Sequence, residues 1–276
     1  MSSESIIQPD GSVRIVVRHE DVSWFDFLGH SRLCRARDMG WNSQSYWISR
    51  GVDILARNIS TTATLWTEHS LSPKTEPLPR KGNFMLDRQH TAKRSALSSV
   101  EAADQVSENA LSFQTFERYR NVEGKGRLLG KIDLIGYEIP LGRTKARQLK
   151  VDLLGVSVDP VPAIEIIELK DTDNTGDSPL MALTEALCYG LQILRCKTDI
   201  LRELRISRPT VNESAFEKIN LRLMAPEQYW HVWLKTPSRR SEIESRFKEI
   251  VDGVNAGIVS SGQASLPSLS VSLEDI

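Results

Sequence analysis

The sequence has few of the residues that hold small extracellular or zinc-binding domains together. Its three cysteines, Cys34, Cys188 and Cys196, lie far apart and form no C-x-x-C pair. This spacing gives no support to a zinc ribbon or a disulfide framework, so we expect a reducing, cytoplasmic setting. The five histidines show no H-x-x-x-H or similar spacing, which disfavours a zinc hydrolase.

Long hydrophobic runs and an excess of one charge are also missing. No segment approaches the roughly 18 apolar residues of a membrane span, and the N-terminus lacks the pattern of a secretory signal, so no membrane partner is expected. The 35 Lys and Arg residues nearly balance the 36 Asp and Glu residues, for a net charge of −1. This balance excludes a histone-like polycation, although a local basic face is enough for binding nucleic acid.

The composition divides the 276 residues into three parts. Residues 1–80 form an N-terminal extension or small domain of mixed character, in which residues 12–18 predict a strand. Residues 81–256 carry the regular patterns of one domain. The serine-rich residues 257–276 are expected to form a flexible tail.

Helical and strand periodicities alternate along the second part. Three strand candidates joined by short gaps favour an antiparallel meander, and the helix after them begins at Pro179, where Ser178 can cap it. In chain order we expect one or two helices in 91–120, strands 127–139, 148–158 and 163–170, helix 179–194, strands 220–224 and 229–234, and helix 238–255. This order predicts an α/β fold with a central mixed sheet flanked by helices.

Two of the predicted strands hold charged residues where apolar ones would be expected. Asp152 lies within L-K-V-D-L-L-G, and Glu168 and Lys170 lie at the C-terminal end of the strand A-I-E-I-I-E-L-K. Glu168 and Lys170 share a face because alternate side chains of a strand point the same way, and such charges are costly to bury unless they are paired. Two carboxylates also supply oxygen ligands for Mg²⁺, and a lysine can orient or deprotonate a water molecule.

This D…E-x-K pattern, with its hydrophobic frame and its place in the element order, resembles the core motif of the PD-(D/E)XK nuclease superfamily. The resemblance covers residues 91–255 and implies a restriction-endonuclease-like core of α-β-β-β-α-β order. It implies that Asp152 and Glu168 bind Mg²⁺ or Mn²⁺, with the main-chain carbonyl of Leu169 as a further ligand. It also implies that Lys170 positions or activates the attacking water.

Three polar residues of the following helix support this interpretation. Glu185, Tyr189 and Gln192 share one face because they are spaced i, i+4, i+7. Glu185-x-x-x-Tyr189 resembles the Q-x-x-x-Y motif of the exonuclease-like branch of the superfamily, with Glu in place of Gln. In that role Tyr189 and Gln192 would steady the substrate or Lys170, and the alternative is a solvated helix face.

Other acidic residues compete for the same site or would complete it. The segments K-I-D-L-I-G and K-V-D-L-L-G are near copies, so Asp133 is an alternative to Asp152 as the metal ligand. The geometry of adjacent strands favours Asp152. Asp133 would then act from the neighbouring strand. An acid on an upstream helix often completes such sites in the family. Glu108 and Glu117 are the candidates, and Glu117 is the weaker one because it lies in the charged run E-R-Y-R. A solvated position is the alternative for both.

Basic residues form two groups at the rim of the predicted core. Such a rim would attract the phosphate backbone of a nucleic acid. The alternative is that both groups are ordinary solvated loops. The groups are Arg118, Arg120, Lys125, Arg127 and Lys131, and Arg143, Lys145, Arg147 and Lys150.

These residues favour a Mg²⁺-dependent nuclease that hydrolyses phosphodiester bonds, with DNA as the substrate that the resemblance implies. One alternative is a catalytically silent nuclease-like fold that binds nucleic acid or a protein partner. Another is a structural role for Asp152, Glu168 and Lys170 as a buried ion-pair network. Many members of the family dimerise, so a homodimer stays an open expectation.

Overall fold

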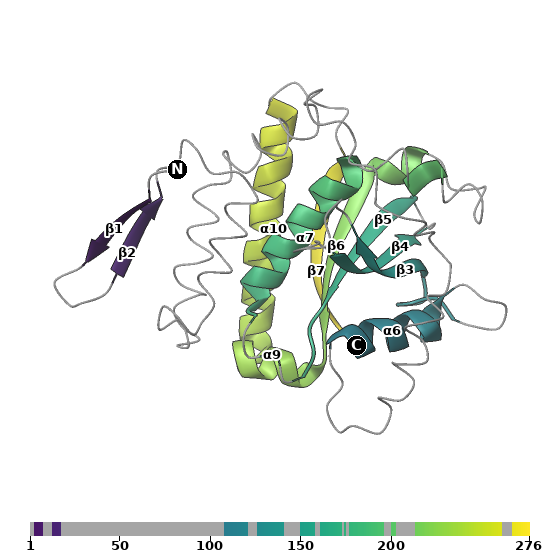
Figure 1. Cartoon of the computed structure of the whole chain (residues 1–276), viewed down its shortest axis with the longest axis horizontal. Coiled ribbons are helices and arrows are strands. Elements are labelled where there is room, and N and C mark those ends of the chain that lie inside the picture. The colour runs from purple at the N-terminus through teal and green to yellow at the C-terminus, as the bar shows by residue number, and fades with distance from the viewer. Residues whose placement is uncertain are drawn as a thin grey trace.

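The centre of the fold is a five-stranded mixed sheet with helices on both faces (Figure 1). The protein is therefore of the α/β class, as the element order predicted. The structure is a computed structural model and describes residues 3–7, 13–17, 108–120, 126–140, 150–157, 161–172, 174, 177–195, 200–202, 213–260 and 267–276.

The sheet combines an antiparallel half with a parallel half, in the strand order β3-β4-β5-β6-β7. The antiparallel half confirms the predicted meander, while β6 and β7 run parallel to β5 and need helical crossovers. The strands are β3 (Ile132–Pro140), β4 (Lys150–Ser157), β5 (Ala163–Leu169), β6 (Lys218–Ala225) and β7 (Ser268–Asp275).

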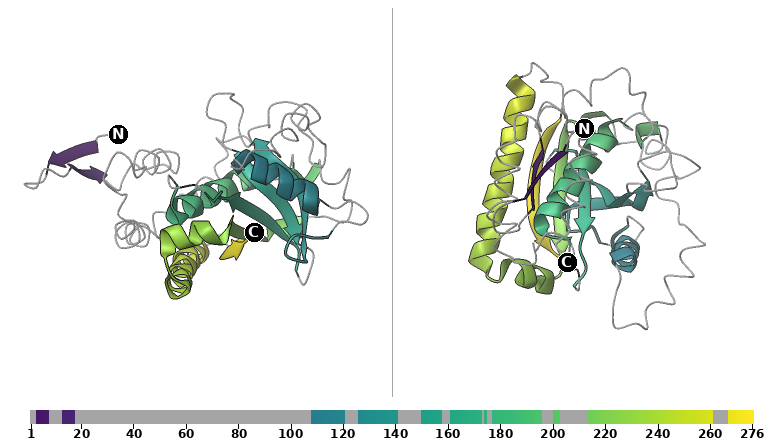
Figure 2. Two further views of the ribbon diagram at one scale, coloured as in Figure 1. Left: turned by 90° about the horizontal axis from the view of Figure 1, so that it is seen from below. Right: turned by 60° about the vertical axis from the view of Figure 1, so that its left-hand side comes forward.

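The helices cover the two faces of the sheet unequally. Helices α7 and α10 lie on one face, and α6 lies on the other (Figure 2). The helical elements around the sheet include α6 (Glu108–Tyr119), α7 (Pro179–Arg195), the 3₁₀ turn η3 (Glu213–Phe216), α9 (Glu227–Leu234) and α10 (Pro237–Ser260). Helix α7 has the predicted cap, because Met181 N–H donates to Ser178 Oγ at 3.3 Å. Within the described residues, no helix is both long and apolar enough to cross a membrane.

Strand β5 is buried along its whole length because it is central and covered on both faces. Ile164 and Ile166 join the apolar cluster beneath α7, whereas Ile167 and Leu169 join the cluster beneath α6. Any acidic residue of β5 therefore lies out of water and requires partners.

Glu165 shows how the fold satisfies such a residue on the α6 face. Its Oε1 accepts a hydrogen bond from Asn220 Nδ2 at 2.6 Å, and its Oε2 accepts one from Arg222 Nε at 2.6 Å. Arg222 also pairs with Glu274 of β7 at 2.8 Å. The result is a buried ion-pair network that crosses three parallel strands.

The prediction of a strand at residues 229–234 is wrong, because these residues belong to α9. The buried side chains are Tyr229, Trp230, Trp233 and Leu234, a spacing that fits one face of a helix and not an alternating strand. Aromatic residues favour strands, but here tertiary packing outweighs that preference.

The prediction of a flexible tail is also wrong for most of its length. Helix α10 continues to Ser260, and β7 pairs in parallel with β6. Leu269, Val271 and Leu273 are buried and alternate with more exposed residues, which is the period-two pattern of a strand covered on one face. The serines at the intervening positions obscured this alternation in the sequence.

Side chains of α10 cover part of the outer edge of β7. Ser268 N–H donates to the carbonyl oxygen of Glu217, the residue directly before β6, so the main chain of Leu269 points away from β6. The side-chain amide of Asn255 in α10 forms two hydrogen bonds with the main chain of Leu269. Its Nδ2 donates to Leu269 C=O at 2.8 Å, and its Oδ1 accepts from Leu269 N–H at 2.9 Å. Arg240 Nη2 donates to Leu273 C=O at 3.1 Å in the same manner. These contacts protect an edge that would otherwise offer unpaired groups.

The N-terminal part is described only as an antiparallel hairpin of β1 (Ser3–Ile7) and β2 (Val13–Val17), and β2 confirms the strand predicted at 12–18. Residues 18–107 lie outside the description, so the predicted N-terminal extension or small domain and the first part of the predicted helical stretch 91–120 stay predictions.

Candidate metal centre

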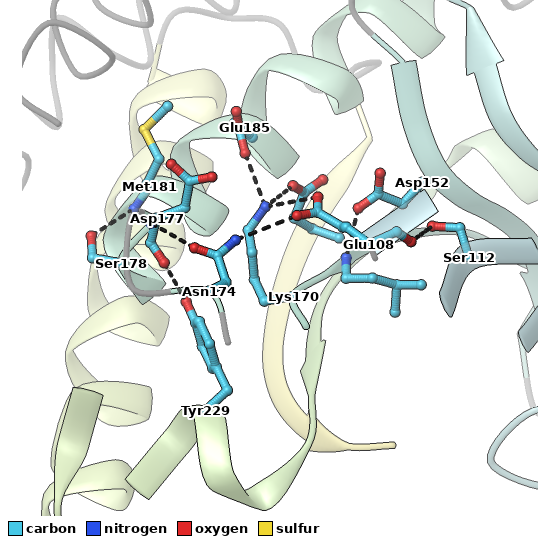
Figure 3. Close-up of polar contacts among 12 residues, drawn as sticks. Glu108, Ser112, Asp152, Lys170, Asn174, Asp177, Ser178, Met181, Glu185 and Tyr229 are labelled. Atoms are coloured by element: carbon cyan, nitrogen blue, oxygen red, sulfur yellow. Dashed lines mark hydrogen bonds and ion pairs between the residues drawn. The ribbon is translucent and has the colours of Figure 1, made fainter. Parts of the chain in front are cut away.

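Four carboxylates gather around one lysine where β5 ends (Figure 3). Strand β4 contributes Asp152, β5 contributes Glu168 with Lys170 directly after it, α6 contributes Glu108 from its first turn, and α7 contributes Glu185. The sequence predicted the strand residues as a group, and the structure brings them together.

Strand register accounts for the position of Asp152. Leu153 pairs with Ile167 across the antiparallel β4–β5 ladder, so the next position on each strand places Asp152 opposite Glu168. Leu169 N–H donates to Asp152 Oδ2 at 2.8 Å and fixes this carboxylate. Leu169 thus contacts the site through its amide, and its carbonyl as a metal ligand stays a prediction.

Glu108, Asp152 and Glu168 form a set that could hold a metal ion. Each offers one carboxylate oxygen, and these oxygens lie within 4.8 Å of one another. Oxygen ligands of this kind suit Mg²⁺ and similar hard cations. A second observation supports the fit: Glu168 Oε2 is buried and has no hydrogen-bond partner among the described residues. Because a buried polar atom without a partner is destabilising, a cation would satisfy it.

Lys170 is a hydrogen-bond donor to three of the carboxylates. Its Nζ lies 2.6 Å from Glu168 Oε1, 3.3 Å from Glu185 Oε2 and 3.4 Å from Glu108 Oε1. Burial lowers the pKa of Lys170, but the surrounding carboxylates, Glu168 first, outweigh burial and hold this pKa well above its usual value of 10.5. Lys170 is therefore protonated in this arrangement.

The carboxylates themselves are hard to ionise together. Burial raises the pKa of Asp152 to about 8, with Lys170 opposing the shift and Glu108 adding to it. Burial and then Asp152 raise the pKa of Glu168 well above its usual value, and burial also raises the pKa of Glu108. One lysine does not balance four carboxylates, so the site favours protons or a further cation.

Two of the three polar residues predicted to share a face of α7, Glu185 and Tyr189, are buried, which excludes a solvated position for them. Glu185 pairs with Lys170, and Tyr189 is only 5% exposed. Burial raises the pKa of the Tyr189 hydroxyl well above its usual value, and Glu168 and Glu185 add to the shift, so Tyr189 lies within electrostatic reach of the site. Gln192 lies in α7, but its side chain is outside the described part of the structure.

Neither competing acid joins the cluster. Asp133 Oδ1 accepts a hydrogen bond from Arg127 Nε at 2.9 Å and pairs on β4 with Val156, several positions from Asp152. Glu117 pairs with Arg120 at 3.3 Å. Of the two helix acids named from the sequence, the structure places Glu108 at the site.

The predicted basic rim is described only in part. Lys150 pairs with Glu138 of β3, and Lys131 is exposed to solvent. Arg143, Lys145 and Arg147 lie outside the described residues. A nucleic-acid-binding role for this set stays a prediction.

Sequence reasoning missed the segment between β5 and α7. Asn174 Nδ2 donates to Glu108 Oε2 at 3.4 Å, and Asp177 C=O accepts a hydrogen bond from Tyr229 at 2.8 Å (Figure 3). The segment D-T-D-N-T-G-D-S reads as a turn, but its partners come from elements remote in the chain.

Comparison of the chain with protein-family models, curated proteins and solved structures finds no match. Its function must therefore be inferred from its own geometry. Fold and site together define an α/β protein with a buried carboxylate cluster that could hold a metal ion.

Proposed function

We propose that this protein is a metal-dependent nuclease of the PD-(D/E)XK type, in which Glu108, Asp152 and Glu168 hold Mg²⁺ or Mn²⁺. The observation that carries the proposal is that Glu168 Oε2 is buried and has no hydrogen-bond partner among the described residues. This oxygen belongs to a set of three close carboxylates beside the buried Lys170. The element order α6-β3-β4-β5-α7-β6 supports it, since this is the order that the motif implies.

When bound, the cation would act as a Lewis acid toward a phosphoryl oxygen and would lower the pKa of a coordinated water. Lys170 is held as a protonated donor, so in this proposal it orients the attacking water or neutralises phosphate charge, and does not abstract a proton. Glu185 keeps the Lys170 ammonium in place from the α7 side. The proposed substrate is DNA.

The near-identical strand sequences provide a matched pair of variants for the test. Asp152→Asn removes a charged ligand but keeps an oxygen that can accept from Leu169 N–H, while Asp133→Asn makes the same chemical change away from the cluster. Plasmid, linear duplex and single-stranded DNA, and single-stranded RNA, are incubated with each protein in Mg²⁺, Mn²⁺ or EDTA.

We expect metal-dependent cleavage by the wild type and by Asp133→Asn. Cleavage by Asp152→Asn should be at least about a hundredfold slower, because altering even the groups that orient metal ligands costs about 10–100-fold. Equal loss in both variants, or cleavage that persists in EDTA, contradicts the proposed site. A folded wild type that binds Mn²⁺ and cleaves none of these substrates favours the silent, binding-only alternative.

A further inference from the structure

Helix α9 anchors the loop that links β5 to α7. Trp233 Nε1 donates to the carbonyl oxygen of Asn174 at 3.1 Å, and the Tyr229 hydroxyl donates to the carbonyl oxygen of Asp177 at 2.8 Å. Tyr229 and Trp233 are themselves buried in the core, so they hold the loop main chain at two points.

The Asn174 amide has a defined orientation within this loop. Its Oδ1 accepts a hydrogen bond from Asp177 N–H at 2.8 Å, and a main-chain N–H can be met only by the oxygen end of an amide. The NH₂ end must therefore point the other way, where Nδ2 lies 3.4 Å from Glu108 Oε2 (Figure 3).

Glu108 is the member of the carboxylate set that most needs such support. Its side chain is 31% exposed, whereas the other two members, Asp152 and Glu168, are buried. The two described hydrogen bonds to its carboxylate come from Lys170 on Oε1 and from Asn174 on Oε2. Each oxygen thus has one donor, and the loss of either donor lets the carboxylate rotate.

We infer that Asn174 is a positioning residue that orients Glu108 toward the metal site, with α9 as the support of Asn174. The inference rests on the proposed metal-dependent function. It assigns to a loop and a helix outside the D…E-x-K motif the task of completing the ligand set.

Two substitutions separate this role from a general role in loop structure. Asn174→Ala removes both ends of the amide. Asn174→Ser keeps a hydroxyl that can accept from Asp177 N–H in a similar turn but cannot reach Glu108 as an amide does. Ser178→Ala is the control, because it removes the cap of α7 from the same loop without touching Glu108.

Mn²⁺ binding is measured for each protein by calorimetry and by electron paramagnetic resonance, and the melting temperature is measured in EDTA. Both Asn174 variants should bind Mn²⁺ about tenfold or more weakly, while Ser178→Ala should bind like the wild type even though it melts earlier. In a Glu108→Gln background, Asn174→Ala should weaken binding no further.

Unchanged Mn²⁺ affinity in both Asn174 variants overturns the inference. So does an equal loss with and without Glu108→Gln, because Asn174 would then act by another route. Failure of the wild type to bind Mn²⁺ is a separate result, since it removes the metal proposal itself and with it this inference.

Discussion

Replacing Lys170 with methionine removes the charge at the centre of the carboxylate cluster while keeping a long apolar side chain. In the metal-free protein the Lys170 ammonium contacts Glu168, Glu185 and Glu108, and Lys170 and Glu168 are almost wholly buried. Removing one partner of a buried ion pair costs about 3–5 kcal/mol, because the other charge is left uncompensated out of water. We expect Lys170→Met to lose about that much free energy of unfolding at pH 8 in EDTA.

The loss should shrink as the pH falls. The pKa of Asp152 is about 8, and that of Glu168 is also raised, so at pH 5.5 protons neutralise part of the cluster and replace some of the missing charge. Urea unfolding of both proteins at pH 8 and pH 5.5, in EDTA, measures the difference. Added Mn²⁺ should restore part of the lost stability at pH 8.

Lys248→Met is the control. Lys248 pairs with Glu244 one turn away on α10 at 3.0 Å, and their side chains are 54% and 26% exposed, so its loss should cost about 0–1 kcal/mol at either pH. A penalty below about 1 kcal/mol for Lys170→Met at pH 8, or a penalty that grows toward pH 5.5, would refute this account of the cluster.

Three further predictions follow from other contacts. The free energy of unfolding of the metal-free wild type should fall as the pH rises from about 4 to 8. Folding raises the pKa of Asp152 from 3.8 to about 8, so the folded state binds more protons than the unfolded state over this range. A free energy of unfolding that rises with pH, measured by urea titration, would contradict this prediction. Arg222→Met should lower the free energy of unfolding by about 3–5 kcal/mol, because it leaves the buried Glu165 carboxylate without its cationic partner. Glu165→Gln in that background should recover part of the lost stability, and no recovery would count against the network. Asn255→Ala should cost about 1–3 kcal/mol and speed amide exchange at Leu269, and unchanged exchange there would argue against edge protection.

Sequence reasoning succeeded where the chemistry is local. The meander and α7 follow from periodicity and from the cap at Ser178. Glu168 and Lys170 come together because they are two apart at the end of one strand, and Asp152 joins them because β4 and β5 are adjacent. Each of these relations needs only neighbouring elements.

It failed where position depends on packing between remote segments. Glu108 lies 62 residues from Lys170, and the sequence favoured it over Glu117 only because Glu117 lies in a charged run. The aromatic run of α9 resembled a strand because its role is to pack and to hold the loop at Asn174, neither of which is local. Serines hid β7 because its polar face carries the partners of the Glu165–Arg222 network.

The two buried glutamates of β5 allow a structural role to be weighed against a ligand-binding one within a single strand. Glu165 and Glu168 are both almost inaccessible to water. Each oxygen of Glu165 has a donor at 2.6 Å, whereas Glu168 has Lys170 at one oxygen and no described hydrogen-bond partner at the other. A purely structural ion-pair network would favour the complete pairing of Glu165. The open oxygen of Glu168, beside Asp152 and Glu108, instead supports the proposal that a metal ion completes this site.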